Sequence, residues 1–208
     1  MSAPLIAIAD YGMGNRRSVE KALEHVGARP AVTRDLELLR SADGVVLPGV
    51  GAFPEAMRHV RRLGLDEPLG ERVRTGAPLL GVCLGMQLLF ERSVEHEGAT
   101  GLALLGGTVT RLEAPKLPHI GWNLVRFERD SALTEGLGEA AAFYHVHSFA
   151  CRPADDADVV GRAQYGERFA SIVERGALFG TQFHPEKSSV DGLALLRNFA
   201  AVCARVAA

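Results

Sequence analysis

The sequence predicts an α/β fold in which a mostly parallel central sheet is flanked by helices. In the first half, short strands that are apolar throughout alternate with helical segments, which is typical of a parallel sheet covered on both faces. In the second half, closely spaced strand candidates predict extra, partly antiparallel strands. Because the 208 residues, 47% hydrophobic and 23% charged, suit one well-buried core, we expect a single domain over residues 1–208.

The first half alternates regularly between the two kinds of element. Residues 5–9 form a continuous apolar strand, and the helix predicted over 18–26 is followed by Gly27, a residue that commonly ends helices. The other predicted elements are strands near 31–33 and over 44–47, helices over 35–40, 54–62 and 71–75, a strand that leads into Cys83, and a helix beginning over 86–90.

The second half changes character, with several strand candidates separated by short turns. They cover residues 107–112, 120–127, 141–149, 159–165, 169–174 and 177–183. We expect them to extend the same sheet. Apolar residues at helical spacing then predict a final helix over 190–206, which closes the domain.

Charge and cysteine content exclude several classes of function. A formal net charge of −2 offers no electrostatic attraction to nucleic acid or to an anionic membrane. The three widely spaced cysteines, Cys83, Cys151 and Cys203, favour neither a disulfide framework nor a zinc site and indicate a reducing, cytoplasmic setting. The apolar run at 5–9 is too short for a signal peptide or a membrane span.

No resident cofactor or metal is expected. The segment over residues 12–17 begins like a dinucleotide-binding fingerprint but lacks its third glycine. No group of His, Asp and Glu residues has the spacing of metal ligands.

The most informative segment is the one around Cys83. This cysteine lies between Gly81 and Gly85, after an apolar strand and before a helix, which is the pattern of a nucleophile elbow with sulfur in place of oxygen. The glycines are needed because a Cβ on either side of so tight a turn would collide with backbone. Backbone N–H groups at the start of the helix favour a thiolate. Without the glycines, a buried core cysteine would be the better interpretation.

A thiol nucleophile needs a base, and the base needs a third group to orient it. His184 follows the last apolar strand, so it lies at a strand end, as Cys83 does, and such ends gather in one crevice of a parallel sheet. Residues two apart in extended backbone project to the same side, so Glu186 is within reach of the His184 ring. The alternative is a turn histidine with no catalytic role.

Attack on an amide creates an oxyanion, which preorganised backbone N–H groups usually stabilise. The N–H of Leu84, directly after the nucleophile, is one candidate. The other candidates lie at Val50 and Gly51 in the glycine-containing end of the strand at 44–47. Taken alone, that segment is equally compatible with a plain strand-to-helix turn.

The residues Gly81–Gln87 together with His184-Pro185-Glu186 resemble the class I (triad) glutamine amidotransferases. Blocks at 11–15, 48–53, 118–123 and 182–188 further resemble the glutaminase subunits of imidazole glycerol phosphate synthases, over essentially the whole chain. The resemblance implies a flavodoxin-like fold and hydrolysis of L-glutamine to glutamate and ammonia. It implies that Cys83 attacks the amide, His184 transfers protons and Glu186 orients the imidazole.

The resemblance also implies a set of substrate contacts. Gln87 and Glu95 match positions that contact the amino-acid end of glutamine, with Glu97 as a competing candidate because the local sequence departs from the family pattern. A solvated surface role is the alternative for either glutamate. The remaining matches are His147, Ser148 and Phe149, where Phe149 replaces a common tyrosine.

The partner implied by the resemblance is a (β/α)8-barrel cyclase, which forms a heterodimer with the glutaminase. It uses the ammonia to make imidazole glycerol phosphate and an aminoimidazole carboxamide ribonucleotide. The matching docking residues are Asn15, Trp122, Tyr144 and Lys187. Ordinary packing, or a solvated charge for Lys187, is the alternative for these side chains.

Three other hypotheses remain open at this point. The chain could be the glutaminase of a different synthase, a stand-alone Cys-dependent hydrolase of related architecture, or a non-catalytic binding module. The blocks at 48–51 and 118–123 argue against the first, and the complete Cys83, His184 and Glu186 set argues against the last.

Overall fold

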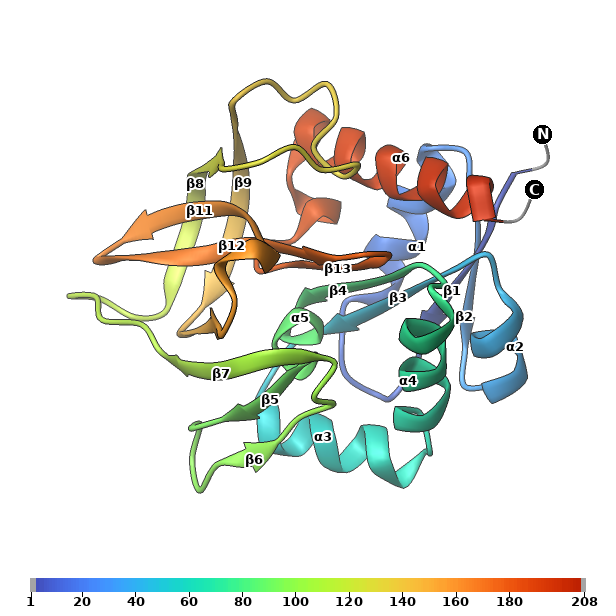
Figure 1. Cartoon of the computed structure of the whole chain (residues 1–208), viewed down its shortest axis with the longest axis horizontal. Helices are drawn as coiled ribbons and strands as arrows, with labels where there is room; N and C mark the ends of the chain where they lie inside the picture. The colour runs from blue at the N-terminus through green and yellow to red at the C-terminus, as the bar shows by residue number, and fades with distance from the viewer. Residues whose placement is uncertain (1–2, 207–208) are drawn as a thin grey trace.

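The computed structural model describes residues 3–206, so the ends of the expected 1–208 unit, residues 1–2 and 207–208, lie outside the described residues. Its largest sheet has nine strands, five of which run parallel in the order β2-β1-β3-β4-β13 (Figure 1). These strands are β1 (Leu5–Ala9), β2 (Arg29–Thr33), β3 (Gly44–Gly49), β4 (Leu79–Cys83) and β13 (Leu178–Thr181). This is the doubly wound order of flavodoxin-like folds, and the predicted fold class is confirmed.

Helices cover both faces of this parallel sheet (Figure 1). Helices α1 (Arg16–His25) and α6 (Ser189–Val206) lie on one face, and α2 (Leu36–Ser41), α3 (Phe53–Arg62) and α4 (Asp66–Thr75) lie on the other. Alternate strand residues supply the two cores: Ile6 and Ile8 belong to the first, Ala7 and Ala9 to the second. Side chains of a strand project alternately, so only an all-apolar strand can fill both cores.

Four antiparallel strands extend the sheet beyond β13, as predicted. They are β12 (Glu167–Arg175), β11 (Val159–Tyr165), β8 (His119–Phe127) and β9 (Ala140–His147), in that spatial order. Strand β9 ends at His147 instead of continuing to Phe149. A separate strand, β10 (Phe149–Pro153), begins there after a one-residue break.

The prediction that residues 107–112 join the same sheet is wrong. They belong to β7 (Leu105–Arg111), which forms a second, four-stranded sheet with β10, β5 (Phe90–Ser93) and β6 (Ala99–Thr100). Burial alternates along β7, so only one of its faces is packed. Alternation identifies a half-buried strand but does not reveal which sheet it joins.

The helix predicted to begin over residues 86–90 starts earlier and is shorter. Helix α5 spans Leu84–Leu88 and therefore begins directly after Cys83, and Phe90 already belongs to β5. All five residues of α5 are buried. The largely apolar run of α5 continues through Leu89 into Phe90, the buried first residue of β5, and this hides the boundary between helix and strand.

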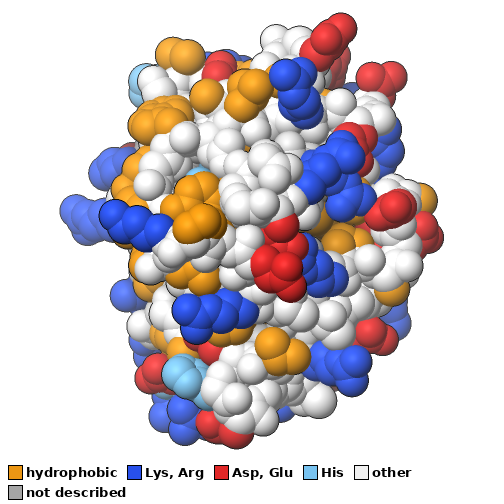
Figure 2. Space-filling model, turned by 90° about the vertical axis from the view of Figure 1, so that its left-hand side faces the viewer, with side chains coloured by type: hydrophobic (Ala, Val, Ile, Leu, Met, Phe, Trp, Pro, Cys, Tyr) orange, Lys and Arg blue, Asp and Glu red, His pale blue; other side chains and the backbone are white. Residues whose placement is uncertain are grey.

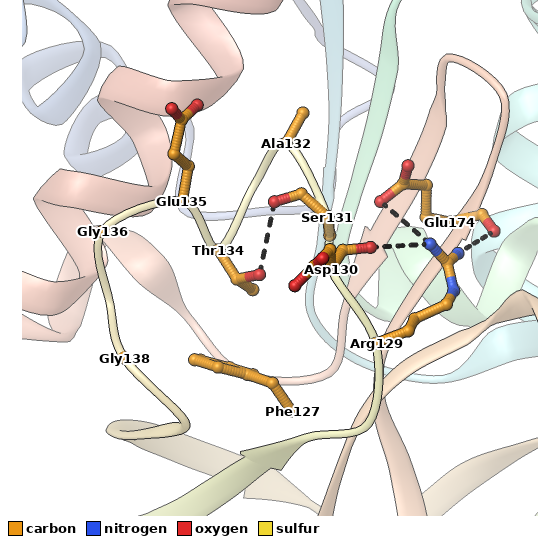
Figure 3. A pocket seen from close by; sticks show the side chains of 10 residues that line it. All are labelled: Phe127, Arg129, Asp130, Ser131, Ala132, Thr134, Glu135, Gly136, Gly138 and Glu174. Atoms are coloured by element: carbon orange, nitrogen blue, oxygen red, sulfur yellow. Dashed lines mark hydrogen bonds and ion pairs between the residues drawn. The ribbon is translucent and has the colours of Figure 1, made fainter.

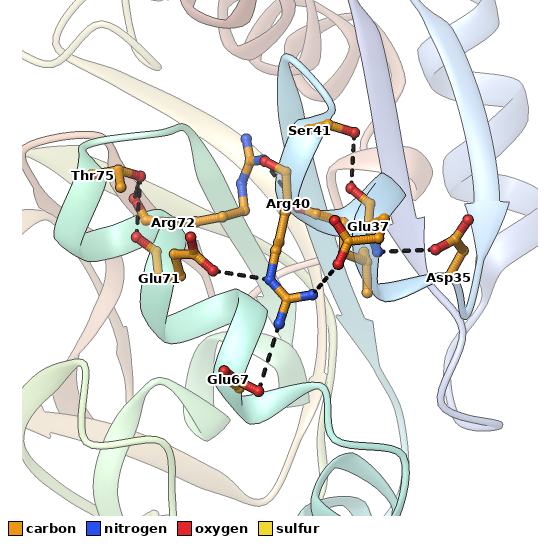
Figure 4. Close-up of polar contacts among 9 residues, drawn as sticks. Asp35, Glu37, Arg40, Ser41, Glu67, Glu71, Arg72 and Thr75 are labelled. Atoms are coloured by element: carbon orange, nitrogen blue, oxygen red, sulfur yellow. Dashed lines mark hydrogen bonds and ion pairs between the residues drawn. The ribbon is translucent and has the colours of Figure 1, made fainter.

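Helices α2 and α4 are joined by two arginines (Figure 4). Arg40 pairs with Glu37, Glu67 and Glu71 near the surface. Arg72, only 1% exposed, donates hydrogen bonds to the carbonyl oxygens of Leu39, Arg40, Ala42 and Pro78. These bonds fix the start of β3 and β4 at the amino ends of the strands.

Among residues 3–206, no helix is both long and apolar enough to cross a bilayer.

Candidate active site

A cavity of about 310 Å³ lies where the parallel strands end. Its lining comes from the ends of β3, β4 and β9, from α5, from the loop after β5, from the start of β10 and from the segment after β13. The lining residues are Val50, Gly51, Cys83, Leu84, Gln87, Glu95, Val146, His147, Ser148, Phe149, His184 and Lys187. Eleven of these twelve, all except Val146, are residues that the sequence analysis selected.

Cys83 occupies the strained turn that its flanking glycines predict. Its backbone has φ +55° and ψ −112°, a conformation that L-residues rarely adopt. A Cβ on Gly81 would lie 2.7 Å from the Gly85 carbonyl oxygen, and one on Gly85 would lie 1.8 Å from that of Leu47. The two glycines therefore allow α5 to pack directly on β3 and β4 while the sulfur faces the cavity.

His184 and Glu186 form a buried ion pair beside this sulfur. His184 Nδ1 lies 2.9 Å from Glu186 Oε1, and the two side chains are 5% and 1% exposed. Contrary to what the sequence analysis assumed, the backbone here is not extended, because Pro185–Lys187 form a single 3-10 turn, η2. Glu186 nevertheless reaches the His184 ring. The predicted contact is present, but the turn brings the carboxylate back toward the ring.

The surroundings of His184 favour its charged form. Burial opposes an imidazolium, but hydrogen bonds to Cys83 and Glu186 and the negative charges of both outweigh burial and raise the pKa of His184 to about 10. The second oxygen of Glu186, Oε2, is buried and has no hydrogen-bond partner among the described residues. The carboxylate therefore keeps unused acceptor capacity next to the imidazole.

Ser188 and Tyr144 hold the backbone of His184, a contact that the sequence analysis did not identify. The fully buried Ser188 hydroxyl donates to the His184 carbonyl at 2.7 Å and accepts the Tyr144 N–H at 3.0 Å. The His184 N–H donates to the Tyr144 carbonyl at 3.0 Å. These bonds tie the turn after β13 to β9, which is the wall opposite Cys83.

Two glutamines connect Cys83 to the strand at Phe149. Gln87 donates through Nε2 to the carbonyl of Phe149 and to Oε1 of Gln182, both at 3.0 Å. Gln182, fully buried, points its own Nε2 at the Cys83 sulfur at 3.9 Å. Because the Gln87 amide nitrogen is occupied within the protein, only its carbonyl oxygen is left for a ligand. Gln182 was not selected from the sequence, since nothing local marks a buried strand-end glutamine.

His147 lines the far wall of the cavity and packs against His119 and His145, and all three rings are held neutral. His147 donates from Nδ1 to the Phe149 carbonyl at 2.8 Å, so its Nε2 accepts from His119 Nδ1 at 3.2 Å. Burial lowers the pKa of His147 to about 3, and burial likewise lowers the pKa values of His119 and His145. The wall at His147 therefore adds no competing positive charge beside His184.

The structure separates the two glutamates that the sequence left as alternatives. Glu95 lines the cavity with a side chain that is 14% exposed, whereas Glu97 is exposed and does not line it. Oε2 of Glu95 accepts the backbone N–H of Phe53 at 2.7 Å. The candidates for oxyanion stabilisation, Val50, Gly51 and Leu84, all border the same cavity.

The four residues selected for partner contact lie in three places. Lys187 borders the cavity, and Asn15 borders a separate surface pocket at the start of α1. Trp122, 56% exposed, packs edge-on against Tyr144 with ring centroids 6.3 Å apart. Ile120 and Leu124, on the same face of β8 as Trp122, are also exposed. Figure 2 shows apolar side chains interspersed with Lys and Arg on one side of the molecule.

A larger cavity, of about 640 Å³, lies away from this site around the loop after β8 (Figure 3). Arg129 crosses one wall and donates to the carbonyls of Asp130 and Glu174. Among the residues that the structure describes, neither a cysteine nor a histidine lines it. Its size therefore does not make it the better candidate for chemistry.

Comparisons with known proteins agree with this geometry. The family model for glutamine amidotransferase class-I matches residues 7–203. The chain is 51% identical over 195 residues to the "Imidazole glycerol phosphate synthase subunit HisH" of Moorella thermoacetica, which covers 93% of each chain. It is 49% identical over 199 residues to the protein of that name from Bacillus cereus, which covers 95% of each.

A likeness among solved structures supports the fold. The structure titled "PurLQS" from Thermotoga maritima superposes with a TM-score of 0.75 at 20% identity, covering 99% of this chain and 100% of that chain. At this identity the likeness concerns the fold alone.

Proposed function

The chain belongs to the class I glutamine amidotransferases and, within them, to the HisH subunits of imidazole glycerol phosphate synthase, and from this premise we propose that it hydrolyses L-glutamine for that synthase. The observation that carries the proposal is the single cavity that holds Cys83 beside the buried His184–Glu186 pair. Such a set suits attack on an amide carbon by sulfur.

In the first step the Cys83 sulfur attacks the side-chain amide carbon of glutamine. The tetrahedral intermediate collapses as the carbon–nitrogen bond breaks, and the proton on His184 goes to the departing nitrogen, so that ammonia leaves and a thioester remains. The raised pKa of His184 keeps this proton on the imidazole at neutral pH until it is transferred.

In the second step water attacks the thioester carbon. His184, now neutral, takes a proton from the water, and the bond to sulfur breaks to release glutamate and restore Cys83. Glu186 holds the imidazole through Nδ1, so that Nε2 is the atom that exchanges protons. The N–H groups of Leu84 and of the Val50–Gly51 segment stabilise the oxyanion in both steps.

The amino-acid end of glutamine lies toward Glu95 and Gln87 in this proposal. The Glu95 carboxylate pairs with the α-ammonium group, and the free carbonyl oxygen of Gln87 accepts a hydrogen bond from it. The backbone of His147, Ser148 and Phe149 borders the other side of the substrate. Phe149 has no hydroxyl, so its contact is apolar or through its backbone.

The ammonia passes to a (β/α)8-barrel cyclase subunit that docks over the cavity. It is there incorporated to give imidazole glycerol phosphate and an aminoimidazole carboxamide ribonucleotide, in the histidine pathway. Exposed Lys187 at the cavity and exposed Trp122 on β8 support a docking face, which would extend to Tyr144 and Asn15. The three cysteines are free and buried, which suits the cytoplasm.

The decisive variant is Cys83→Ala, assayed in complex with the cyclase. We expect glutamine-dependent synthesis to fall by at least about 10³-fold, the scale seen when a covalent nucleophile is removed, while synthesis driven by added ammonium persists. Both routes are followed by formation of imidazole glycerol phosphate, with Cys151→Ala as the matched control. Equal loss of both routes would give the cysteine another role.

We also propose that the docked cyclase controls hydrolysis. The Val50–Gly51 segment is exposed at the cavity rim, where a partner can turn one of its peptides. The isolated chain should therefore release glutamate from glutamine slowly, and the cyclase with its nucleotide should stimulate that release. Full glutaminase activity of the purified chain alone would contradict this control.

A further inference from the structure

Glu95 does more than border the cavity, because it also holds the start of a helix. Its Oε2 accepts the N–H of Phe53, the first residue of α3, at 2.7 Å across 42 positions of sequence. The preceding residue, Ala52, occupies the N-cap position and has no side chain that could accept this bond. Glu95 thus caps α3 from another element, with a negative charge at the positive end of the helix.

A second contact holds the other end of the same short segment. The Tyr11 hydroxyl, fully buried, donates to the Pro48 carbonyl at 2.7 Å. The ring lies so close that a Cβ on Gly49 would be 2.6 Å from its oxygen. The segment 49–52, which contains the proposed oxyanion donors, is therefore anchored by Tyr11 before it and by Glu95 after it.

The two oxygens of Glu95 face different neighbours. Oε2 accepts the Phe53 N–H. The nearest cationic group to Oε1 is His96 Nε2 at 4.0 Å, which is too far for a hydrogen bond, and the Glu95 side chain borders the cavity. Oε1 is consequently available to a cation in the cavity. One carboxylate can bind a substrate ammonium and the backbone of the oxyanion segment at the same time.

We propose that Glu95 is a positioning residue that couples binding of the α-ammonium group of glutamine to the geometry of the oxyanion segment. The inference rests on the proposed function and deepens it. Fixing Oε1 on the ammonium restrains the carboxylate, and through Oε2 this restrains Phe53 and the peptides at Val50 and Gly51. Amides without the α-ammonium group bind without that restraint.

Two variants of Glu95 separate the coupling from simple charge attraction. Glu95→Gln and Glu95→Met lose the negative charge equally and have similar volume, but only glutamine retains an oxygen that accepts the Phe53 N–H. In complex with the cyclase and its nucleotide, both variants should raise the KM for glutamine. We expect kcat of Glu95→Met to be about 10-fold below that of Glu95→Gln, the scale expected for loss of a helix cap.

The monoamide of glutaric acid, which is glutamine without its α-amino group, provides the second readout. On this compound no ammonium can engage Oε1, so the difference in kcat between Glu95→Gln and Glu95→Met should shrink from about 10-fold to less than about 3-fold. An undiminished difference would leave Glu95 as a helix cap that is not coupled to the ammonium. The exposed neighbour gives the matched control, since Glu97→Met should change neither substrate's rate. Melting curves of all variants report any loss of folded protein.

Equal kcat values for Glu95→Gln and Glu95→Met on glutamine would overturn the coupling and leave Glu95 as a charge alone. If Glu95→Met does not fold, the comparison of Glu95→Gln with wild type still decides. A kcat for Glu95→Gln as low as that of the nucleophile variant would contradict rescue by its amide oxygen. Absence of any glutamine hydrolysis by the wild-type complex would instead refute the proposed function itself.

Discussion

Arg72 and Glu186 are both buried charged residues, yet they are satisfied in opposite ways. The guanidinium of Arg72 donates to four backbone carbonyls at the amino ends of the strands. The carboxylate of Glu186 has one partner, His184, and its other oxygen is buried without a partner among the described residues. All three guanidinium nitrogens of Arg72 therefore have hydrogen-bond partners, whereas the Glu186 carboxylate can still accept a hydrogen bond.

The difference follows from what each group has to do. A buried guanidinium whose three nitrogens all have backbone partners rigidifies its surroundings and offers little to a ligand. Cys83 and the unsaturated carboxylate of Glu186, through hydrogen bonds and charge, together raise the pKa of His184 and so hold its proton. We therefore expect burial of charge at the carboxyl ends of the strands to serve chemistry, and burial of charge at the amino ends to serve stability.

Of the two buried charges, Glu186 should give the larger effect on catalysis when its charge is removed. Glu186→Gln keeps the shape but leaves the imidazole less well oriented and uncompensated, so kcat should fall by about 10²- to 10⁴-fold. The measurement is steady-state glutamate release by the complex, with Glu174→Gln as a control at a partly buried carboxylate outside the cavity around Cys83. An unchanged kcat would remove Glu186 from the catalytic set.

The same variant should move the pH profile in a defined direction. Glu186 raises the pKa of His184, so its loss lowers that pKa from about 10 and the alkaline limb of kcat/KM should shift to lower pH. The folded pKa of His184 lies above its ordinary value of 6.5, so its stabilising contribution is complete below that pH and is lost as pH rises through about 10. A shift of the alkaline limb of kcat/KM to higher pH in Glu186→Gln would contradict this prediction.

Arg72→Met tests the saturated member of the comparison. The variant leaves several carbonyls unpaired, so we expect it to lose about 3 kcal/mol of unfolding free energy. The kcat/KM of the folded complex should stay within about 2-fold of wild type, because Arg72 lies at the opposite strand ends from the cavity. Urea unfolding and steady-state kinetics measure the two quantities separately. A large loss of kcat/KM without loss of stability would break the distinction.

The smallest effect is expected for the neighbouring surface cluster. Arg40 pairs with three glutamates whose side chains are mostly exposed, and water and salt screen such pairs. Arg40→Ala should lower the melting temperature by less than about 3 °C. A drop as large as that of Arg72→Met would show that the cluster in Figure 4 acts as one unit.

The cavity around Cys83 could be predicted from sequence because its main residues lie at strand ends. The glycines around Cys83 and the strand before His184 each mark a position in a parallel sheet, and parallel strand ends converge. The contact to Glu186 was also predicted, although the backbone makes it through a 3-10 turn. Two residues that are two positions apart can bring their side chains together in either an extended backbone or a 3-10 turn.

The contacts that the sequence did not reveal are long-range and pass through backbone atoms. The hydroxyl of Ser188 joins Tyr144 to His184, and Glu95 accepts the N–H of Phe53, without any local pattern that predicts either bond. The placement of β7 in a second sheet is of the same kind. The periodicity of the sequence indicates which face of a strand is buried, but tertiary packing determines which elements cover that face.

Covalent labelling by a glutamine-like alkylating agent, with and without the Glu186 carboxylate, tests the central claim most directly. The rate of adduct formation is measured by mass spectrometry of the intact complex, and the modified residue is located in its peptides. We expect a single adduct on Cys83, none on buried Cys151 or Cys203, and labelling at least about 10-fold slower in Glu186→Gln. Labelling of another residue, or an equal rate in the variant, would contradict the account.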